Sequence, residues 1–290
     1  AGIWGSTWLA IKFQVGEVDP MVSVAYRFLI AGILLIAYCQ IRKMPMKFKA
    51  SEHFFILLQG LFIFGFNYWL VYMAELHLTS GLVGLLFSTL VFMNILNSRI
   101  FLKTPFEPRI LIGGAMGLGG MALVFQKDLI AFSFSSETSV ALVLALSGAY
   151  VASLGNITSA RNQMKGIPVL QSNAVGMMYG GIAMSLFSLL SGKPFTYEPT
   201  IGYLFSLGYL ALFGSVFAFT AYLTLVGEIG ASRAGYVTLI SPIIALTLST
   251  FFEDYRWSAL GLLGVLMILG GNALVLRMKG SGKPLRLAKS

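Results

Sequence analysis

The stretch Gly119-Gly-Met-Ala-Leu-Val124 returns later in the chain as Gly270-Gly-Asn-Ala-Leu-Val275. The two copies share five of six residues and lie 151 residues apart. At the same offset Gly84 matches Gly235 and Gly113 matches Gly264, so the register holds from residue 84 to residue 124. The chain therefore contains an internal duplication, and both copies are expected to form the same elements.

The composition indicates which solvent surrounds the duplicated unit. Hydrophobic residues make up 57% of the 290 residues and charged residues only 11%, and the mean hydropathy is +0.82. A water-soluble monomer of this size would leave too much apolar surface uncovered, and a chain this rich in apolar residues does not stay disordered. The composition therefore predicts a membrane protein.

Apolar runs of membrane-spanning length lie between clusters of charged residues. A hydrocarbon core of roughly 30 Å needs about 20 apolar residues per helix. Ten runs meet or approach this length, at 1–14, 21–41, 54–74, 81–102, 110–126, 139–160, 168–191, 201–226, 231–252 and 257–276. The first is the shortest, and we expect a segment before Ala1 to complete it. The sequence thus predicts ten transmembrane helices, five in each copy.

Lysine and arginine are distributed unevenly between the loops. Fifteen of them lie in the loops after even-numbered spans or in the C-terminal tail, whereas the opposite loops hold only Lys127, Lys193 and Arg256. Because cytoplasmic loops carry the excess of basic residues, both termini are expected in the cytoplasm. Basic residues that flank the spans can contact anionic lipid headgroups, which accounts for the net charge of +9. This arrangement argues against nucleic-acid binding.

The odd number of spans in each copy determines how the copies are related. After five crossings the second copy enters the membrane from the opposite side, so the repeats are inverted. We predict an all-α polytopic membrane protein with ten transmembrane helices in two inverted five-helix repeats, at 1–127 and 138–276, followed by a basic cytoplasmic tail at 277–290. Inverted repeats are typical of secondary transporters, which bind a substrate near the midplane and open alternately to either side.

No motif in the sequence indicates enzymatic chemistry. His53 and His77 are the only histidines and lie on different predicted sides of the membrane, so they cannot form an HExxH zinc site. Residues Gly117 to Ala122 formally fit a dinucleotide-binding fingerprint, but they lie inside an apolar span, where close helix packing explains small residues better. Cys39 is the only cysteine, which excludes an internal disulfide. We predict no catalytic residue, no cofactor and no metal.

Polar and aromatic residues within the spans are the candidates for a substrate path, because such groups are costly against lipid. In the third span Gly65, Tyr68, Tyr72 and Glu75 have helical spacing and share one face. Tyr222 lies one residue from the position equivalent to Tyr72. The predicted substrate-binding residues are Trp4, Trp8, Tyr68, Tyr72, Asn94, Tyr150, Asn156 and Tyr222. Helix packing, interhelical hydrogen bonds or anchoring at the membrane interface are the alternatives for these residues.

Two further features bear on the transport cycle. Pro242 in the ninth span is the predicted hinge, because proline removes a backbone hydrogen bond in the middle of a helix. All eleven acidic residues lie at or near predicted span ends, which leaves none at the midplane to relay protons or bind sodium. We therefore expect transport down the substrate gradient, or exchange, without strong ion coupling.

Five short motifs give the chain a resemblance to a known family. They are Trp4-Gly-Ser-Thr-Trp8, Arg27-Phe28, Leu78-Thr-Ser-Gly81, Ser241-Pro242 and Glu253 before the tenth span. In this order they resemble the drug/metabolite transporter superfamily, in its EamA-type ten-helix form, over essentially the whole chain. Within it the chain is most similar to bacterial inner-membrane exporters of aromatic amino acids. The resemblance implies efflux of aromatic and related amino acids. We expect the protein to be a monomer whose partners are this small-molecule substrate and membrane lipid.

The first copy departs from the family pattern at two positions. Val91 stands opposite Pro242, and Lys103 lies near the position that corresponds to Glu253. These departures argue against identical movements of the two halves. Export of another small metabolite or of a drug is the alternative within the superfamily, and an intramembrane enzyme that acts on lipid is the alternative outside it.

Arg27 is a charged residue inside a span. It lies seven residues past Pro20, about 10 Å deep at 1.5 Å per residue, so it needs a partner or water. Glu17 and Asp19 are the nearest acidic candidates in the sequence. The family resemblance favours a structural part for Arg27, and recognition of a substrate carboxylate is the alternative.

Overall fold

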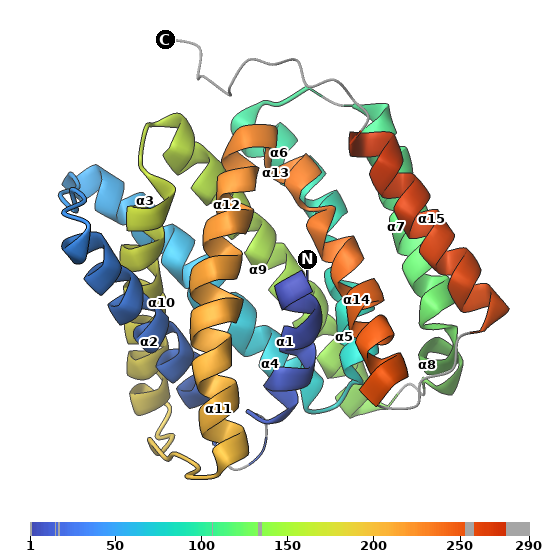
Figure 1. Ribbon diagram of the computed structural model, residues 1–290, viewed down its shortest axis with the longest axis horizontal. Coiled ribbons are helices and arrows are strands. Elements are labelled where there is room, and N and C mark those ends of the chain that lie inside the picture. Colours follow the sequence, from blue (N-terminus) through green and yellow to red (C-terminus); the bar gives the residue numbers. More distant parts are fainter. Residues whose placement is uncertain are drawn as a thin grey trace.

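A computed structural model describes residues 2–14, 16, 18–105, 107–132, 135–252 and 258–276. All secondary structure in this part of the chain is helical, and the helices form one bundle (Figure 1). The all-α prediction is therefore confirmed. The predicted basic tail at 277–290 lies outside the described residues.

Each predicted span coincides with one helix or with a run of consecutive helical segments, of which η1 and η2 are π-helical. The segments are α1 Gly2–Lys12, α2 Pro20–Ile41, α3 Ala50–Leu61, η1 Phe62–Phe66, α4 Asn67–Glu75, α5 Ser80–Phe87, α6 Leu90–Leu102, α7 Pro108–Val124, α8 Gln126–Ala131, α9 Ser136–Met164, α10 Val169–Leu190, α11 Ile201–Tyr209, η2 Leu210–Phe217, α12 Ala218–Ile229, α13 Ala231–Ala234, α14 Val237–Phe252 and α15 Ala259–Leu276. Six helical stretches in the described residues are long and apolar enough to cross a membrane, and α7 and α15 are shorter apolar helices. The short helix α8 was not predicted, since its residues fall in a connection that we expected to be a loop.

Helices at equivalent positions of the two copies pack directly against each other. Helices α7 and α15 touch at their glycines: a Cβ on Gly120 would lie 2.5 Å from the Gly264 carbonyl oxygen, and a Cβ on Gly113 would lie 2.8 Å from the Gly271 carbonyl oxygen. The earlier glycine of α7 contacts the later glycine of α15, and the later one contacts the earlier one. The two helices are therefore antiparallel, as Figure 1 shows. Small residues allow this close approach in a membrane, where lipid is as apolar as a side chain.

The helices α2 and α10 form a second pair of the same kind. A Cβ on Gly32 would lie 2.8 Å from Met178 Sδ, and a Cβ on Gly181 would lie 2.8 Å from Leu29 Cγ. The earlier residue of α2 contacts the later residue of α10, so this pair is also antiparallel. Two antiparallel pairs of equivalent helices are the arrangement expected of inverted repeats.

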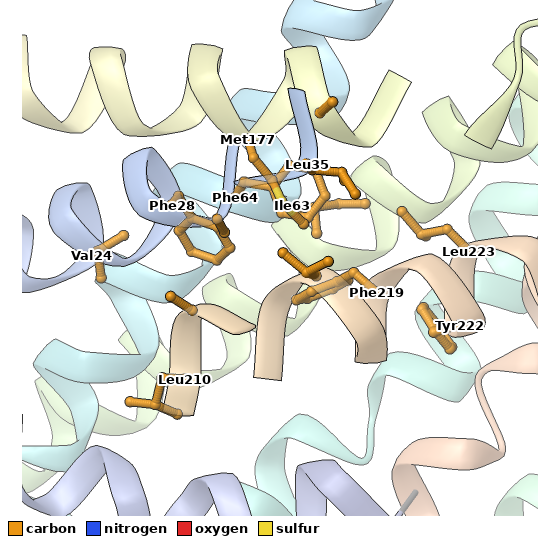
Figure 2. Packing of buried hydrophobic residues seen from close by; sticks show 14 of the residues in the cluster. Val24, Phe28, Leu35, Ile63, Phe64, Met177, Leu210, Phe219, Tyr222 and Leu223 are labelled. Carbon is orange, nitrogen blue, oxygen red and sulfur yellow. The ribbon is translucent and has the colours of Figure 1, made fainter. Parts of the chain in front are cut away.

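A cluster of aromatic side chains joins the two copies in the middle of the bundle. Phe28 of α2, Phe64 of η1 and Phe219 of α12 converge there (Figure 2). The ring centroids of Phe28 and Phe64 are 5.4 Å apart, and those of Phe64 and Phe219 are 5.1 Å apart. Such pairs contribute about 0.5–1.5 kcal/mol beyond the burial of their surface.

Four spans are not regular α-helices, which the sequence did not predict. The π-helical segments η1 and η2 lie at equivalent places of the two copies. The span of α5 and α6 is interrupted at Ser88, whose hydroxyl donates to the Gly84 carbonyl at 2.8 Å. The span of α13 and α14 is interrupted at Gly235, whose carbonyl accepts a hydrogen bond from the Thr238 hydroxyl at 2.6 Å. Side-chain hydroxyls thus satisfy carbonyls at the breaks, as a bilayer requires.

The substitution Gly120→Ala should destabilise the protein. Its Cβ would meet the Gly264 carbonyl oxygen and lie 2.8 Å from Ile268 Cγ1, and overpacking of this kind costs about 1–3 kcal/mol. The matched control is Gly208→Ala, because a Cβ at Gly208 meets nothing within 4 Å. Thermal unfolding in detergent should therefore show a lower midpoint for Gly120→Ala only. Equal midpoints for both variants would contradict the close contact between α7 and α15.

Candidate functional site

A central cavity lies where the interrupted spans approach α1, α4, α9 and α12. Its empty volume, counted with the open space at its mouth, is about 750 Å³. The lining residues are Trp4, Thr7 and Ile11 of α1, Ile63 of η1, Asn67, Tyr68 and Val71 of α4, Gly84 and Phe87 of α5, Leu90 of α6, Ala152 and Asn156 of α9, Phe219 and Tyr222 of α12, and Thr238 and Ser241 of α14. Residues of α5, α6 and α14 close to the two breaks are therefore part of the cavity wall.

Three aromatic rings form one wall of this cavity. The Trp4 ring centroid lies 5.1 Å from that of Phe219 and 4.9 Å from that of Tyr222. Trp4 is held in place by its indole N–H, which donates to the Gly214 carbonyl at 3.3 Å. Phe219 and Tyr222 both project from α12 (Figure 2). Rings arranged in this way can stack with an aromatic group that enters the cavity.

A polar group faces the same space from α9. Asn156 Nδ2 donates to the Tyr222 hydroxyl at 2.9 Å and approaches Asn94 Oδ1 at 3.4 Å. Asn94 lies behind the wall, where its Nδ2 donates to the Ala231 carbonyl at 3.1 Å. The Asn94–Asn156–Tyr222 network thus joins α6, α9, α12 and α13 at the cavity.

Asn67 adds an unused acceptor to the cavity wall. Its Nδ2 donates to the Ile63 carbonyl at 3.4 Å, within the turn where η1 passes into α4. Its Oδ1 has no hydrogen-bond partner among the residues that the structure describes. A buried acceptor without a partner is costly, so Asn67 can accept a hydrogen bond from a ligand group in the cavity.

The predicted binding residues fall into four groups. Trp4, Tyr68, Asn156 and Tyr222 line the cavity, and Asn94 is bonded directly behind it. Tyr72 is buried beyond Tyr68 and does not line the cavity. Tyr150 is 43% exposed on the surface of α9, so the geometry gives no support to a binding role. The side chain of Trp8 lies outside the described part of the chain, as does that of the predicted hinge Pro242, although the helices α1 and α14 run through these positions.

The predicted stripe on the third span is only partly correct. Tyr68 faces the cavity, but Gly65 faces α10, where its Cβ would lie 3.7 Å from the Gly180 carbonyl oxygen. The reason is that Gly65 belongs to the π-helical segment η1, in which the spacing of faces differs from that of an α-helix. A uniform helical period therefore placed Gly65 on the wrong face.

Several cavity residues were not predicted. Phe87, Phe219 and Thr238 are ordinary members of apolar spans, and nothing in their spacing distinguishes them from lipid-facing residues. Gly84 could have been found, because its match to Gly235 places a glycine in the middle of the equivalent span of each copy. Asn67 could also have been found, because it is a polar residue in the middle of a span, directly beside Tyr68.

The environment of Arg27 differs from the prediction. Asp19 forms an ion pair with Lys193 at 3.1 Å and does not pair with Arg27, and Glu17 lies outside the described residues. Arg27 is 1% exposed, its Nε donates to Ser215 Oγ at 2.9 Å, and its guanidinium lies over the Tyr68 ring, 4.3 Å from the centroid. A charged group thus lies directly behind the cavity wall.

Comparison with known proteins gives one family. The model of the EamA-like transporter family matches residues 1–126 and 139–277. The chain is 27% identical over 277 residues to the uncharacterized inner membrane transporter YedA of Escherichia coli K12, which covers 92% of this chain and 86% of that protein. It is 26% identical over 251 residues to the uncharacterized transporter YoaV of Bacillus subtilis, with 84% and 82% covered.

Two further similarities complete this comparison. Protein PagO of Salmonella typhimurium is 23% identical to the chain over 273 residues, which cover 94% of this chain and 89% of that protein. A solved crystal structure of a protein superimposes with a TM-score of 0.79 at 18% identity, over 96% of this chain and 95% of that one. The second similarity shows that the fold is shared.

A cysteine at the cavity should react with a water-soluble thiol reagent. Phe87→Cys replaces a partly exposed lining residue, and the reaction of folded protein is expected to modify it. Ser188→Cys is the control, because Ser188 is fully buried in α10. Both variants are made with Cys39→Ala, which removes the buried natural thiol, and modification is measured by intact mass. Protection of Phe87→Cys equal to that of Ser188→Cys would contradict a water-accessible cavity.

Proposed function

We propose that this chain, which belongs to the EamA-like transporter family, exports amino acids across a bacterial inner membrane. Aromatic amino acids are the first candidates, and the central cavity is the binding site. YedA, one of its relatives, is named an inner membrane transporter, which supports the same membrane for this chain. With the excess of basic residues in the cytoplasm, both termini are cytoplasmic. The protein acts as a monomer.

The single observation that carries the substrate class is the wall of three rings. Trp4, Phe219 and Tyr222 form one wall of a mainly apolar cavity. Each ring pair formed with a bound aromatic side chain would contribute about 0.5–1.5 kcal/mol beyond burial. Asn67 and Asn156 stand beside the rings, so one amphipathic molecule can use both kinds of contact at once.

The cavity is placed where alternating access can act on it. It is bounded by two interrupted spans, α5–α6 and α13–α14, from the two copies. Interrupted helices at the midplane are common at transporter sites, because they present backbone groups and allow the two halves of a span to move. Pro242, in α14 and next to the lining residue Ser241, is the proposed hinge.

Weak ion coupling is part of the same proposal. The acidic residues of the described chain lie at helix ends or in connections: Asp19 caps α2, Glu107 caps α7 and Glu75 ends α4. A carboxylate near the cavity centre is the usual means of coupling to protons or sodium. We propose that the substrate moves down its own gradient or in exchange.

Transport of labelled phenylalanine tests the substrate class. Purified protein in sealed liposomes should release preloaded phenylalanine, unchanged chemically, faster than liposomes without protein. Trp4→Leu removes a stacking face and should lower transport at subsaturating substrate about two- to tenfold. Tyr150→Leu is the control, since Tyr150 is exposed away from the cavity.

Three other outcomes would count against the proposal. Release of drugs or other metabolites but no amino acid would replace amino acids with another substrate class. Chemical conversion of the phenylalanine or of the lipid would indicate an enzyme. An equal loss of transport in Trp4→Leu and Tyr150→Leu would remove the wall of rings as the binding site.

An imposed ion gradient tests the coupling separately. With equal phenylalanine on both sides, a proton or sodium gradient should cause no net accumulation, because no described carboxylate lies at the cavity. The measurement is phenylalanine content inside the liposomes over time, with an ionophore control. Accumulation that the ionophore abolishes would show that the transporter is ion-driven.

A further inference from the structure

The buried guanidinium of Arg27 has hydrogen-bonding capacity that the protein does not use. Nε donates to Ser215 Oγ, whereas Nη1 and Nη2 form no hydrogen bond of regular geometry with the described residues, and only the Tyr68 and Tyr72 hydroxyls lie close enough to interact with the guanidinium. These two atoms carry four of the five N–H donors of arginine. The faces of Tyr68 and Phe28, at 4.3 and 5.2 Å from Cζ, provide only partial compensation. A buried cation left in this state is costly unless a ligand completes it.

The way Arg27 is held leaves its outer edge free. The Ser215 hydroxyl, which accepts from Nε, donates in turn to the Leu210 carbonyl at 2.9 Å, five residues earlier in η2. The π-helical segment therefore provides the anchor for Nε. With Nε fixed, Nη1 and Nη2 are oriented but form no regular hydrogen bond with the described residues. Arginine presents such a pair of donors in the spacing that a carboxylate accepts.

Only the Tyr68 ring and the backbone at Gly214 separate these donors from the cavity. The Tyr68 ring lies over the guanidinium on one side and lines the cavity with the other. A Cβ on Gly214 would lie 3.2 Å from Arg27 Nη2 and 2.9 Å from Cγ2 of Thr7, another lining residue. The absence of a side chain at Gly214 thus lets the guanidinium come close to the cavity wall.

We propose that Arg27 binds the carboxylate of the transported amino acid, with Tyr68 as the movable cover of this subsite. The inference rests on the proposed function and deepens it. When the Tyr68 ring turns aside, Nη1 and Nη2 face the cavity and the carboxylate accepts from both. The Tyr72 hydroxyl interacts with Arg27 and adds a donor beside it.

The assignment also gives the substrate one orientation. The carboxylate lies at Arg27, and the side-chain ring lies against Trp4, Phe219 and Tyr222. The ammonium group can then donate to the free Oδ1 of Asn67, which belongs to the same turn as Tyr68. The three contacts together recognise a zwitterion with an aromatic side chain.

Binding of two ligands to the purified full-length protein tests this assignment. Phenylalanine and phenylalaninamide differ only at the carboxyl group, and the wild-type protein should bind phenylalanine about 10- to 100-fold more tightly, as expected for a hydrogen-bonded charge. Arg27→Gln should lower the affinity for phenylalanine to that for the amide and leave the affinity for the amide unchanged. Arg27→Lys should give an intermediate preference, because lysine cannot form the paired contact.

The matched control is Arg161→Gln, in the last turn of α9. Arg161 also lies over an aromatic ring, that of Phe55, but not at the cavity. This variant should keep the wild-type preference. If Arg27→Gln does not fold, the wild-type comparison of the two ligands and Arg27→Lys still decide the question.

Each remaining result overturns a defined part of the interpretation. Equal binding of phenylalanine and its amide by the wild-type protein would remove the carboxylate subsite and leave amino acid transport standing. Equal weakening of both ligands in Arg27→Gln would make Arg27 a structural residue only. Absence of any binding of phenylalanine would overturn the proposed function and the subsite with it.

Discussion

Close contact between glycine backbones is the constraint on which the rest of the structure depends. In lipid no hydrophobic force draws helices together, so association relies on packing at short distance. Here Gly120 meets Gly264 and Gly113 meets Gly271, and between α2 and α10 the glycines Gly32 and Gly181 leave room for side chains of the opposite helix. These contacts join equivalent helices of the two copies in opposite directions. The central cavity then lies among the spans that these two pairs do not use.

Irregular backbone determines what those remaining spans can do. A regular helix satisfies all its hydrogen bonds internally and offers a ligand only side chains. At the breaks near Ser88 and Gly235 side-chain hydroxyls bond to backbone carbonyls, and the π-helical segments η1 and η2 add further irregular backbone to the bundle. Arg27 depends on one of these features, because Ser215 and Leu210 belong to η2. Fold and site are therefore linked through the same local departures from helical geometry.

Much of the fold could be predicted from the sequence, and the reasons are physical. Span positions follow from the length of apolar runs, and the inverted relation follows from an odd number of spans per copy. Trp4, Tyr68, Asn156 and Tyr222 could be named because polar or aromatic groups in mid-span are costly against lipid. Tyr150 met the same criterion but lies on the surface. Which face of a helix turns inward depends on packing and on π-helical turns, and the faces of Gly65 and Phe219 could not be read from a regular period.

The pairing of equivalent helices has a consequence for how this protein can change over time. A larger residue at Gly120 is met across the interface by Gly264, and one at Gly113 by Gly271, all of them positions in the last helix of a repeat. A larger side chain introduced in one half therefore clashes with the backbone of the other half of the same chain. The clash can be removed only by a second mutation far away in the sequence. At these positions the two halves cannot drift independently, however much their loops and cavity residues diverge.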